Sequence, residues 1–281
     1  MVNGIINIYK EAGFTSHDVV AKLRGIVKQR KIGHTGTLDP DATGVLPVCF
    51  GNATKLCDML TDKSKEYEAC LILGVTTDTQ DMSGEILTRQ TVTCSEEDAK
   101  QAVLSFIGGY EQIPPMYSAI KVNGKKLYEL ARNGIEIERK PRRVEIPNIK
   151  IVECNLPEIR FVVSCSKGTY IRQLGQDIAH KLNTCGHLIS LRRTRIGNFD
   201  VGQASKVKEV KEEDLISVTK ALSHMVVVRV EQSLETDIKN GKKVKLSVNE
   251  EIVFVINENE DPIAILEKVE ENIYRVKRGL F

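Results

Sequence analysis

The stretch from Gly33 to Pro47 restricts the fold of this chain more than any other part of the sequence. Its glycines can adopt positive φ angles or let another segment approach closely. Pro40 fixes its own φ and pushes the preceding Asp39 toward extended geometry. A short apolar run, 45–50, follows. The pattern therefore predicts an ordered, non-repetitive loop that leads into the core, and ordered loops often carry functional sites.

Three side chains of this loop are candidates for chemistry. His34 can titrate near neutral pH, and Asp39 and Asp41 place carboxylates on either side of Pro40. A phosphate-binding P-loop is excluded, because no Gly-Lys-Ser/Thr sequence follows the glycines. A triad of Ser16, His34 and Asp39 can be drawn, but triples of this kind arise by chance. From local composition alone, a glycine-rich turn with solvated carboxylates is as well supported as a functional loop.

The chain has 281 residues, 41% of them apolar and 28% charged, which is typical of a water-soluble globular protein with one or two domains. No apolar run approaches the roughly 18 to 20 residues of a membrane span. The N-terminus has neither a basic start nor a small-residue cleavage site, so we expect a cytoplasmic location. The seven cysteines form no C-x-x-C pair, which argues against a zinc site and a disulfide framework.

Charge is distributed unevenly along the chain, although the formal net charge is only +2. Residues 121–143 hold eight Lys or Arg and three acidic residues, a local net charge of +5, whereas 74–98 is acidic. This segregation is expected of a protein with a phosphate-binding face and a solvated reverse side. The basic stretch therefore favours nucleic-acid binding, although an ordinary solvated surface has the same composition.

Apolar periodicity predicts a mixture of helices and strands. Helices are expected from Ser16, as N-cap, to 27, from Ser95 to 107, and from about Ile171 to Leu182, with Arg172 near the start. Strands are expected at 5–9, 65–73, 85–87, 144–154 and 159–165, and short β-prone runs follow from about 226. These patterns predict an α/β fold with a small C-terminal all-β domain; the resemblance described next implies the α+β type, with a mixed, mostly antiparallel sheet.

Four motifs, in order along residues 3–225, resemble those of the TruB family of tRNA pseudouridine-55 synthases. They are Gly-His-Thr-Gly-x-Leu-Asp-Pro from Gly33, Pro-Pro-x-Tyr-Ser-Ala-x-Lys within 112–128, Lys-Gly-Thr-Tyr-Ile-Arg at 167–172, and the segment 186–197. The Lys-x-Tyr pattern at 65–67 also matches. The sequence departs from the family at its Lys-Pro-x-Gly turn, where Glu11 replaces the proline.

The resemblance implies the pseudouridine synthase fold and the conversion of uridine to pseudouridine at position 55, in the T-loop of tRNA. Because this reaction is an isomerisation, no redox cofactor, ATP or metal is expected. The implied partner is the T-arm of tRNA, with no membrane and no required protein partner, and we expect a monomer. The implied domains are a catalytic domain, 1–225, with an RNA-binding thumb insertion at about 112–143, and a PUA-like RNA-binding domain, 226–281.

The resemblance also implies roles for individual residues. Asp39 would be the catalytic nucleophile, and His34 would occupy the space that the flipped uridine leaves. Arg172 would pair with Asp39, since its planar guanidinium binds a carboxylate through two donors and keeps it ionised. A carboxylate partner would also relieve the unfavourable position of this cation near the start of a helix.

The remaining implied residues contact the base or the RNA backbone. Tyr67 would stack on the target base, Tyr170 would lie against the base or Asp39, and Leu191 would form an apolar wall of the uracil pocket. The thumb would contact phosphates through Lys121, Lys125 and Lys126. The C-terminal domain offers four further lysines for the acceptor side of tRNA: Lys239, Lys242, Lys243 and Lys245.

Three other functions are compatible with parts of this sequence. A non-catalytic tRNA-binding protein or RNA-folding chaperone would keep the basic regions but would not need Asp39. A glycosidase would use Asp39 and Asp41 as a carboxylate pair, which leaves the RNA-type basic residues unexplained. A guided ribonucleoprotein synthase of the same superfamily is generally longer, with basic extensions that this chain lacks.

Overall fold

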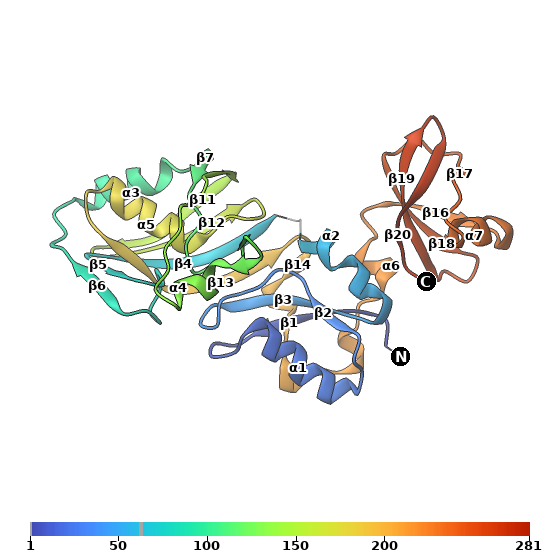
Figure 1. The fold of residues 1–281 in the computed structure, drawn as a ribbon, viewed down its shortest axis with the longest axis horizontal. Helices are drawn as coiled ribbons and strands as arrows, with labels where there is room; N and C mark the ends of the chain where they lie inside the picture. Colours follow the sequence, from blue (N-terminus) through green and yellow to red (C-terminus); the bar gives the residue numbers. More distant parts are fainter. Residues whose placement is uncertain (1, 62–63) are drawn as a thin grey trace. The chain divides into compact units, whose positions relative to one another are not determined.

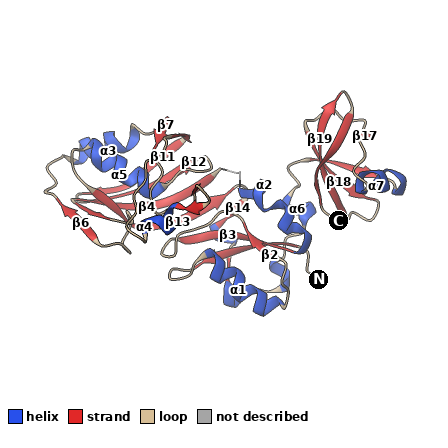
Figure 2. Cartoon of the chain, in the orientation of Figure 1, coloured by secondary structure: helices blue, strands red, loops and turns tan. Residues whose placement is uncertain are grey.

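The computed structural model describes residues 2–61 and 64–281 and has a mixed α/β fold (Figure 1, Figure 2). The chain divides into two compact units. The first unit comprises residues 1–40, 45–61 and 198–281, and the second comprises residues 41–44 and 62–197. The predicted domain limits, 1–225 and 226–281, stay predictions.

The second unit is built on a sheet in which β11, β12, β4 and β13 follow one another as antiparallel neighbours. These strands are β4 (Lys65–Leu73), β11 (Asn148–Asn155), β12 (Glu158–Cys165) and β13 (Gly186–Ile196). β13 also pairs in parallel with Thr43 and Gly44, the first residues of β3 (Thr43–Phe50). The predicted mixed, mostly antiparallel sheet is therefore confirmed.

Two helices cover strands of this sheet (Figure 1). α3 (Glu96–Leu104) contacts β11, and α5 (Ile171–Lys181) contacts β4 and β13. α3 begins at Ser95 as predicted, through a capping box with Asp98. Alternate residues of β12 are fully buried, because side chains of a strand point to opposite faces. The buried set is Ile159, Phe161, Val163 and Cys165.

The predicted thumb, residues 112–143, starts and ends at a strand pair. β7 (Gly108–Gln112) pairs antiparallel with β10 (Arg142–Ile146), and Gln112 lies opposite Arg142. Between them are the short strands β8 (Lys121–Val122) and β9 (Lys125–Lys126) and the helix α4 (Leu127–Ala131). A second hairpin, β5 (Val75–Thr77) with β6 (Ile86–Arg89), precedes α3.

In the first unit, β1 (Gly4–Lys10) lies beside β3 and pairs in parallel with β15 (Ser205–Lys206). β2 (Ile32–His34) pairs antiparallel with β3. α1 (Ser16–Val27) packs its apolar stripe into the same core. The predicted N-cap of α1 is wrong by one residue, because Thr15 caps the helix in a capping box with Asp18.

Several short elements complete the part of the first unit that precedes residue 226. They are η1 (Gly51–Leu56), α2 (Cys57–Thr61), β14 (Phe199–Asp200), η2 (Val201–Gln203), η3 (Val207–Glu209), η4 (Glu212–Asp214) and α6 (Val218–Ala221). The first two follow β3 directly. None of the helices in the described residues, 2–61 and 64–281, is long and apolar enough to cross a membrane.

The C-terminal part of the first unit is a five-stranded sheet with its own core. The strand order is β16 (Val226–Val230), β18 (Ile252–Asn257), β19 (Pro262–Glu270), β20 (Ile273–Gly279) and β17 (Val244–Lys245). The predicted C-terminal β domain is confirmed, and it carries one helix that the strand-like pattern did not indicate, α7 (Gln232–Lys239).

Candidate functional site

Asp39 lies between two peptide groups that neighbouring side chains hold in place. Ser16 Oγ accepts a hydrogen bond from the Leu38 N–H at 2.9 Å and donates one to the Leu38 carbonyl at 3.2 Å. On the other side, the Pro40 carbonyl accepts from Lys10 Nζ at 2.7 Å. The Asp39 side chain is itself half-buried. The backbone on both sides of the predicted nucleophile is therefore fixed before any substrate binds.

Lys10, the last residue of β1, anchors this loop through a fully buried ammonium group. Its Nζ donates to the carbonyls of Phe14 at 2.6 Å, Pro40 at 2.7 Å and Glu11 at 3.1 Å. A buried charge is costly unless hydrogen bonds replace its water, and these three acceptors match its three donors. Glu11, which replaces the family's proline, contributes its carbonyl to this arrangement, and Gly13 adds a backbone bond to Pro40 at 3.1 Å.

His34 is the last residue of β2, opposite Val48 of β3, and is half-buried. The next residue, Thr35, donates its backbone N–H to the Pro47 carbonyl at 3.0 Å. Gly36 then adopts a φ of +70°, which favours glycine and turns the chain away from the sheet. The loop is thus ordered, as predicted, but it is shorter than the predicted range 33–47, because Gly33 and His34 belong to β2 and residues 43–47 belong to β3.

Gly44 brings the end of the same loop against β13. It pairs with Arg193, its φ is +104°, and a Cβ placed on it would lie 2.1 Å from the Arg193 carbonyl oxygen. No larger residue fits this space without moving the backbone of β13. The signature therefore requires glycine here for a close approach of two backbones, in addition to a turn.

Arg172, the second residue of α5, is 5% exposed and lies among backbone carbonyls. Its Nη1 donates to the Thr79 carbonyl at 2.7 Å and its Nη2 donates to the Tyr117 carbonyl at 2.9 Å. Its Nε lies 3.8 Å from a carboxylate oxygen of Asp81. Asp81 is thus a carboxylate neighbour of Arg172 that the sequence did not predict, and the pairing of Arg172 with Asp39 stays a prediction.

Sequence reasoning missed Asp81, which organises the loop between β5 and β6. One of its carboxylate oxygens accepts from Thr79 Oγ1 at 2.6 Å and from the N–H and hydroxyl of Ser83 at 3.0 and 2.6 Å. Its carbonyl accepts from Thr77 Oγ1 at 2.6 Å. The signal was available: Thr, Ser and Asp side chains packed this densely fold a loop by bonding to nearby backbone.

Tyr67 and Leu191 lie on one face of the sheet in the second unit. Leu191 is opposite Ala69, which is two residues from Tyr67 on β4, so all three side chains point the same way. α5 covers this face, because a Cβ placed on Gly175 would lie 3.3 Å from Cδ1 of Leu71, a further residue of the same alternating set. Tyr170 and Arg172, at the start of α5, are therefore brought to the side that carries Tyr67 and Leu191.

A buried polar network supports the start of α5. Gln173 Nε2 donates to Asp177 Oδ1 at 2.8 Å, and Tyr110 OH donates to Asp177 Oδ2 at 3.3 Å. Burial raises the pKa of the Asp177 carboxyl above its ordinary value. Burial also raises the pKa of the Tyr110 phenol far above its usual range, with the Asp177 carboxylate as a further cause. Tyr110 therefore stays a neutral donor at physiological pH.

The predicted thumb lysines are placed on the β8–β9 hairpin and stay accessible. Lys121 and Lys125 are exposed, and Lys126 Nζ bonds to Tyr128 OH at 3.2 Å. Within the described residues, none of these three lysines has an ion pair with a carboxylate. Arg132 also lies over the Tyr128 ring, at 5.3 Å from its centroid. The hairpin thus presents cations beside an aromatic ring, which suits phosphates and bases.

The C-terminal domain differs from the thumb in its charge. Residues 226–281 contain nine basic and eleven acidic residues, a formal net charge of −2. Three of the four lysines proposed for tRNA lie in ion pairs: Lys239 with Glu235 at 2.5 Å, Lys242 with Asp237 at 2.7 Å and Lys243 with Glu270 at 3.5 Å. The fourth of these lysines, Lys245, is exposed. This domain therefore offers less free positive charge than its lysine count indicated.

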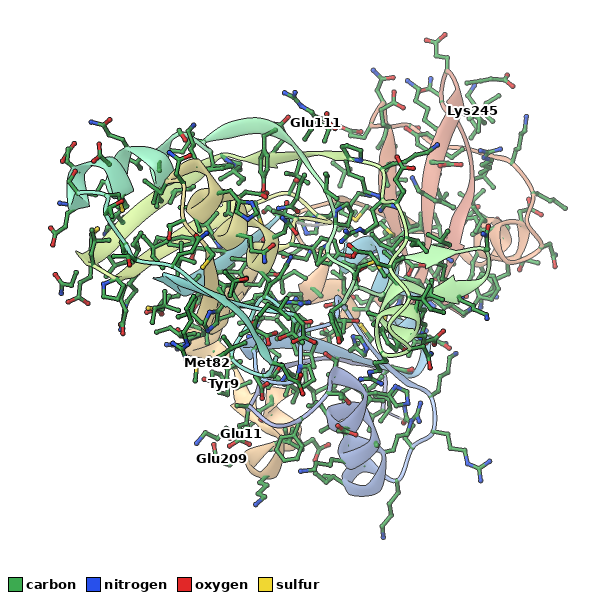
Figure 3. All side chains as sticks on the ribbon, turned by 60° about the vertical axis from the view of Figure 1, so that its left-hand side comes forward. Tyr9, Glu11, Met82, Glu111, Glu209 and Lys245 are labelled. Carbon is green, nitrogen blue, oxygen red and sulfur yellow. The ribbon has the colours of Figure 1, made fainter. Side chains whose placement is uncertain are left out.

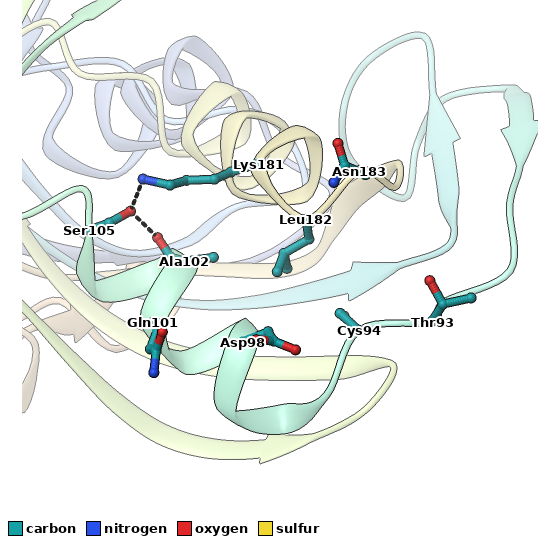
Figure 4. A pocket seen from close by; sticks show the side chains of 9 residues that line it. All are labelled: Thr93, Cys94, Asp98, Gln101, Ala102, Ser105, Lys181, Leu182 and Asn183. Carbon is teal, nitrogen blue, oxygen red and sulfur yellow. Dashed lines mark hydrogen bonds between the residues drawn. The ribbon is translucent and has the colours of Figure 1, made fainter.

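A pocket of about 580 Å³ lies away from the predicted site residues (Figure 4). It is bounded by α3, by Thr93 and Cys94 before that helix, and by the end of α5, where Lys181 Nζ donates to Ser105 Oγ at 2.6 Å. None of the residues predicted to bind the substrate lines it. Pocket size alone therefore does not identify the candidate site in this chain.

Solved structures share this fold. The structure titled "Crystal Structure of a Cbf5-Nop10-Gar1 Complex" has a TM-score of 0.74 and 25% identity, and covers 99% of this chain and 85% of its own. The structure titled "Structure of H/ACA RNP bound to a substrate RNA containing 2'-deoxyuridine" has a TM-score of 0.72 at 22% identity, with the same coverage. The second likeness shows the fold alone.

Family models and curated relatives agree with each other. The model described as "TruB family pseudouridylate synthase (N terminal domain)" matches residues 24–171, and "tRNA pseudouridylate synthase B C-terminal domain" matches 172–234. The protein named tRNA pseudouridine synthase B from Alkaliphilus oremlandii is 48% identical over 86% of this chain and 83% of its own. Its namesake from Lachnoclostridium phytofermentans is 58% identical over 75% of this chain and 71% of its own.

The fold and these motifs define the chain as a pseudouridylate synthase, which is an enzyme of the isomerase class. Among such enzymes, the chain belongs to the TruB family.

Proposed function

We propose that this protein converts uridine to pseudouridine at position 55, in the T-loop of tRNA. The observation that carries the proposal is the placement of Asp39 between two clamped peptide groups, in the signature of a family whose curated members are named tRNA pseudouridine synthase B. A rigid, half-buried carboxylate suits a nucleophile, because little reorganisation is needed during the reaction.

The reaction exchanges one bond between base and ribose for another and moves one proton. The bond between N1 of uracil and C1′ of ribose breaks, the base turns, and C5 bonds to C1′. The proton on C5 leaves and N1 gains a proton, so the product is an isomer of the substrate and no external oxidant or reductant is consumed. Asp39 acts as the nucleophile, and Arg172 pairs with it and keeps it ionised. The carbonyls of Thr79 and Tyr117, together with the Asp81 carboxylate, hold the guanidinium in place for this role.

Binding must also extract the target uridine from a folded loop. Flipping costs about a few kcal/mol, which new contacts have to offset. Tyr67 stacks on the flipped base, Tyr170 and Leu191 border the uracil, and His34 fills the vacated space. The shared sheet face of Tyr67 and Leu191, beneath α5, supports this assignment.

Contacts to the tRNA backbone come mainly from the thumb. Lys121, Lys125 and Lys126 bind phosphates of the T-arm, which makes affinity fall as salt rises. The finer parts of the proposal are that the chain acts on the T-arm as a monomer, without a required protein partner, in the cytoplasm. Gel filtration with light scattering of the tRNA complex tests the monomer: a mass of one chain plus one tRNA is expected, and two chains would contradict it.

The test of activity uses tRNA that carries tritium at C5 of its uridines. The protein, with no added cofactor, is incubated with this tRNA and the tritium released to water is counted. Wild type should release it, Asp39→Asn should not, and Asp41→Asn should behave as wild type because Asp41 is an exposed carboxylate beyond Pro40.

Each other outcome contradicts a different part of the proposal. Tight tRNA binding without release by the wild type contradicts the enzyme and favours a non-catalytic RNA-binding protein. Equal release by wild type and Asp39→Asn means that another group is the nucleophile. Loss of release in Asp41→Asn as well would indicate a carboxylate pair.

A further inference from the structure

Gln112 occupies the junction between the body of the second unit and the thumb. It is the last residue of β7, and its strand partner is Arg142, so the chain enters and leaves the thumb at this pair. The side chain is 1% exposed, and it therefore points into the protein and away from any RNA that the thumb binds. A buried amide at this position needs internal hydrogen-bond partners.

The amide of Gln112 brackets the backbone of Tyr170. Its Oε1 accepts from the Tyr170 N–H at 2.8 Å, and its Nε2 donates to the Tyr170 carbonyl at 3.0 Å. Nε2 also donates to Tyr110 OH at 2.5 Å, and Tyr110 OH donates in turn to Asp177 of α5 at 3.3 Å. Both amide hydrogens and the amide oxygen of Gln112 are thus used. Two of the three bonds go to the Tyr170 backbone, and the third goes to Tyr110, which bonds to α5.

These two bonds fix the peptide groups on both sides of the Tyr170 Cα. Tyr170 has an extended backbone, with φ −98° and ψ 110°, and precedes α5 without a side-chain cap of its own. A hydrogen bond to its N–H restrains φ and one to its carbonyl restrains ψ, so together they set the direction of the Cα–Cβ bond and hence of the ring. The same segment leads, two residues on, into Arg172.

A second contact ties the thumb to this point. Arg172 Nη2 donates to the carbonyl of Tyr117, five residues beyond Gln112 in the thumb, at 2.9 Å. Tyr117 OH donates to Asp78 at 3.0 Å, on the loop that holds Arg172 from the other side. The first residues of the thumb are therefore connected to Tyr170 and Arg172 by side-chain bonds at two places.

We propose that Gln112 is a positioning residue, which sets Tyr170 against the target base and ties that position to the base of the thumb. The proposal rests on the proposed function and adds a residue to it that touches neither the RNA nor the reacting atoms. Its signature is a slower chemical step with unchanged binding, because the thumb lysines that hold the phosphates stay in place.

The test compares Gln112→Leu with Glu111→Gln, an exposed neighbour on the same strand (Figure 3). With enzyme in saturating excess over tritiated tRNA, the single-turnover rate of Gln112→Leu should fall about 10- to 100-fold, the loss expected when a reacting group is displaced by roughly 1 Å. Its Kd for tRNA, measured by filter binding, should stay within about twofold. Glu111→Gln should match the wild type in both measurements, and thermal unfolding should show both variants folded.

The pH dependence of the rate of Gln112→Glu distinguishes a positioning role of Gln112 from a purely structural one. A protonated glutamic acid can donate to the Tyr170 carbonyl and accept from its N–H, but a carboxylate cannot donate. Burial and the nearby Asp177 favour the protonated form, and Arg142, the strand partner, favours the carboxylate. The rate of this variant, divided by the wild-type rate at each pH, should therefore rise as pH falls, and the same ratio for Gln112→Leu should stay flat. Asp177 and Tyr110 are common to all variants, so their titration cancels in the ratio.

The outcomes separate this proposal from the proposed function. If the wild type releases no tritium, the proposed function fails. If the wild type is active and Gln112→Leu keeps its single-turnover rate, or loses affinity and rate in parallel, Gln112 does not position Tyr170. A pH-independent ratio for a folded Gln112→Glu also overturns the proposal.

Discussion

Ser16 and Thr15 are neighbours with separable roles, and exchanging each for alanine tests the clamp on Asp39. Thr15 caps α1, whereas Ser16 bonds to both the N–H and the carbonyl of Leu38. Ser16→Ala removes two hydrogen bonds and leaves the Leu38 N–H inside the protein, where an unsatisfied donor costs about 1–3 kcal/mol. Thr15→Ala removes a cap worth about 1 kcal/mol. Both variants should thus be destabilised, and Ser16→Ala should lose at least as much free energy of unfolding as Thr15→Ala.

Only Ser16→Ala should affect catalysis. Leu38 precedes Asp39 directly, so freeing its peptide lets the carboxylate shift, and a displacement of roughly 1 Å costs about 100-fold in rate. We expect the single-turnover release of tritium to fall about 10- to 100-fold in Ser16→Ala and to stay at the wild-type rate in Thr15→Ala. Urea unfolding of both variants measures their stability.

Two outcomes of these measurements would contradict the proposed role of Ser16. If Ser16→Ala loses the predicted free energy of unfolding but keeps the wild-type rate, the clamp stabilises the loop without orienting Asp39. If Thr15→Ala is slowed as much as Ser16→Ala at equal stability, the loss of rate follows from loosening α1, and the reasoning from Leu38 is wrong.

Three further predictions concern close packing, charge and pH. Gly44→Ala should lower the free energy of unfolding by about 3 kcal/mol or more, since its Cβ would meet the Arg193 carbonyl at 2.1 Å with φ at +104°; near-wild-type urea stability would contradict this. Lys125→Gln should reduce the slope of log K for tRNA against log salt by about 0.7 to 0.9, whereas Lys243→Gln, which already pairs with a carboxylate, should leave the slope unchanged. Burial raises the pKa of Asp177, so the folded state binds its proton more tightly than the unfolded state does, and stability is lost as pH rises from the ordinary aspartate pKa of about 3.9 to the higher folded value. Asp177→Asn should flatten the thermal-unfolding profile over that interval, and an unchanged profile would assign the loss to other groups.

The sequence alone determined the mixed fold and the family of this protein. Alternation in 159–165 predicted a strand with one buried face, and the glycine and proline spacing of 33–47 predicted an ordered loop. Local patterns suffice there, because strand faces and turn conformations depend on near neighbours. The candidate residues also came from the sequence, since the motifs carry Asp39 and Arg172 directly.

Other features depend on contacts between residues that are distant in the chain. Ser16 was predicted as a helix cap, but its hydroxyl bonds to Leu38, 22 residues away, and the cap passed to Thr15. Gln112 reaches Tyr170 across 58 residues, and no local pattern distinguishes it from a solvated glutamine. Helix caps and strand faces are decided by spacing within a few residues, whereas these clamps exist only where folding brings a buried polar side chain to a distant peptide group that has lost its water. The sequence motifs therefore indicated the residues predicted to carry the chemistry of this protein. The residues that hold them in place were decided only by the tertiary structure.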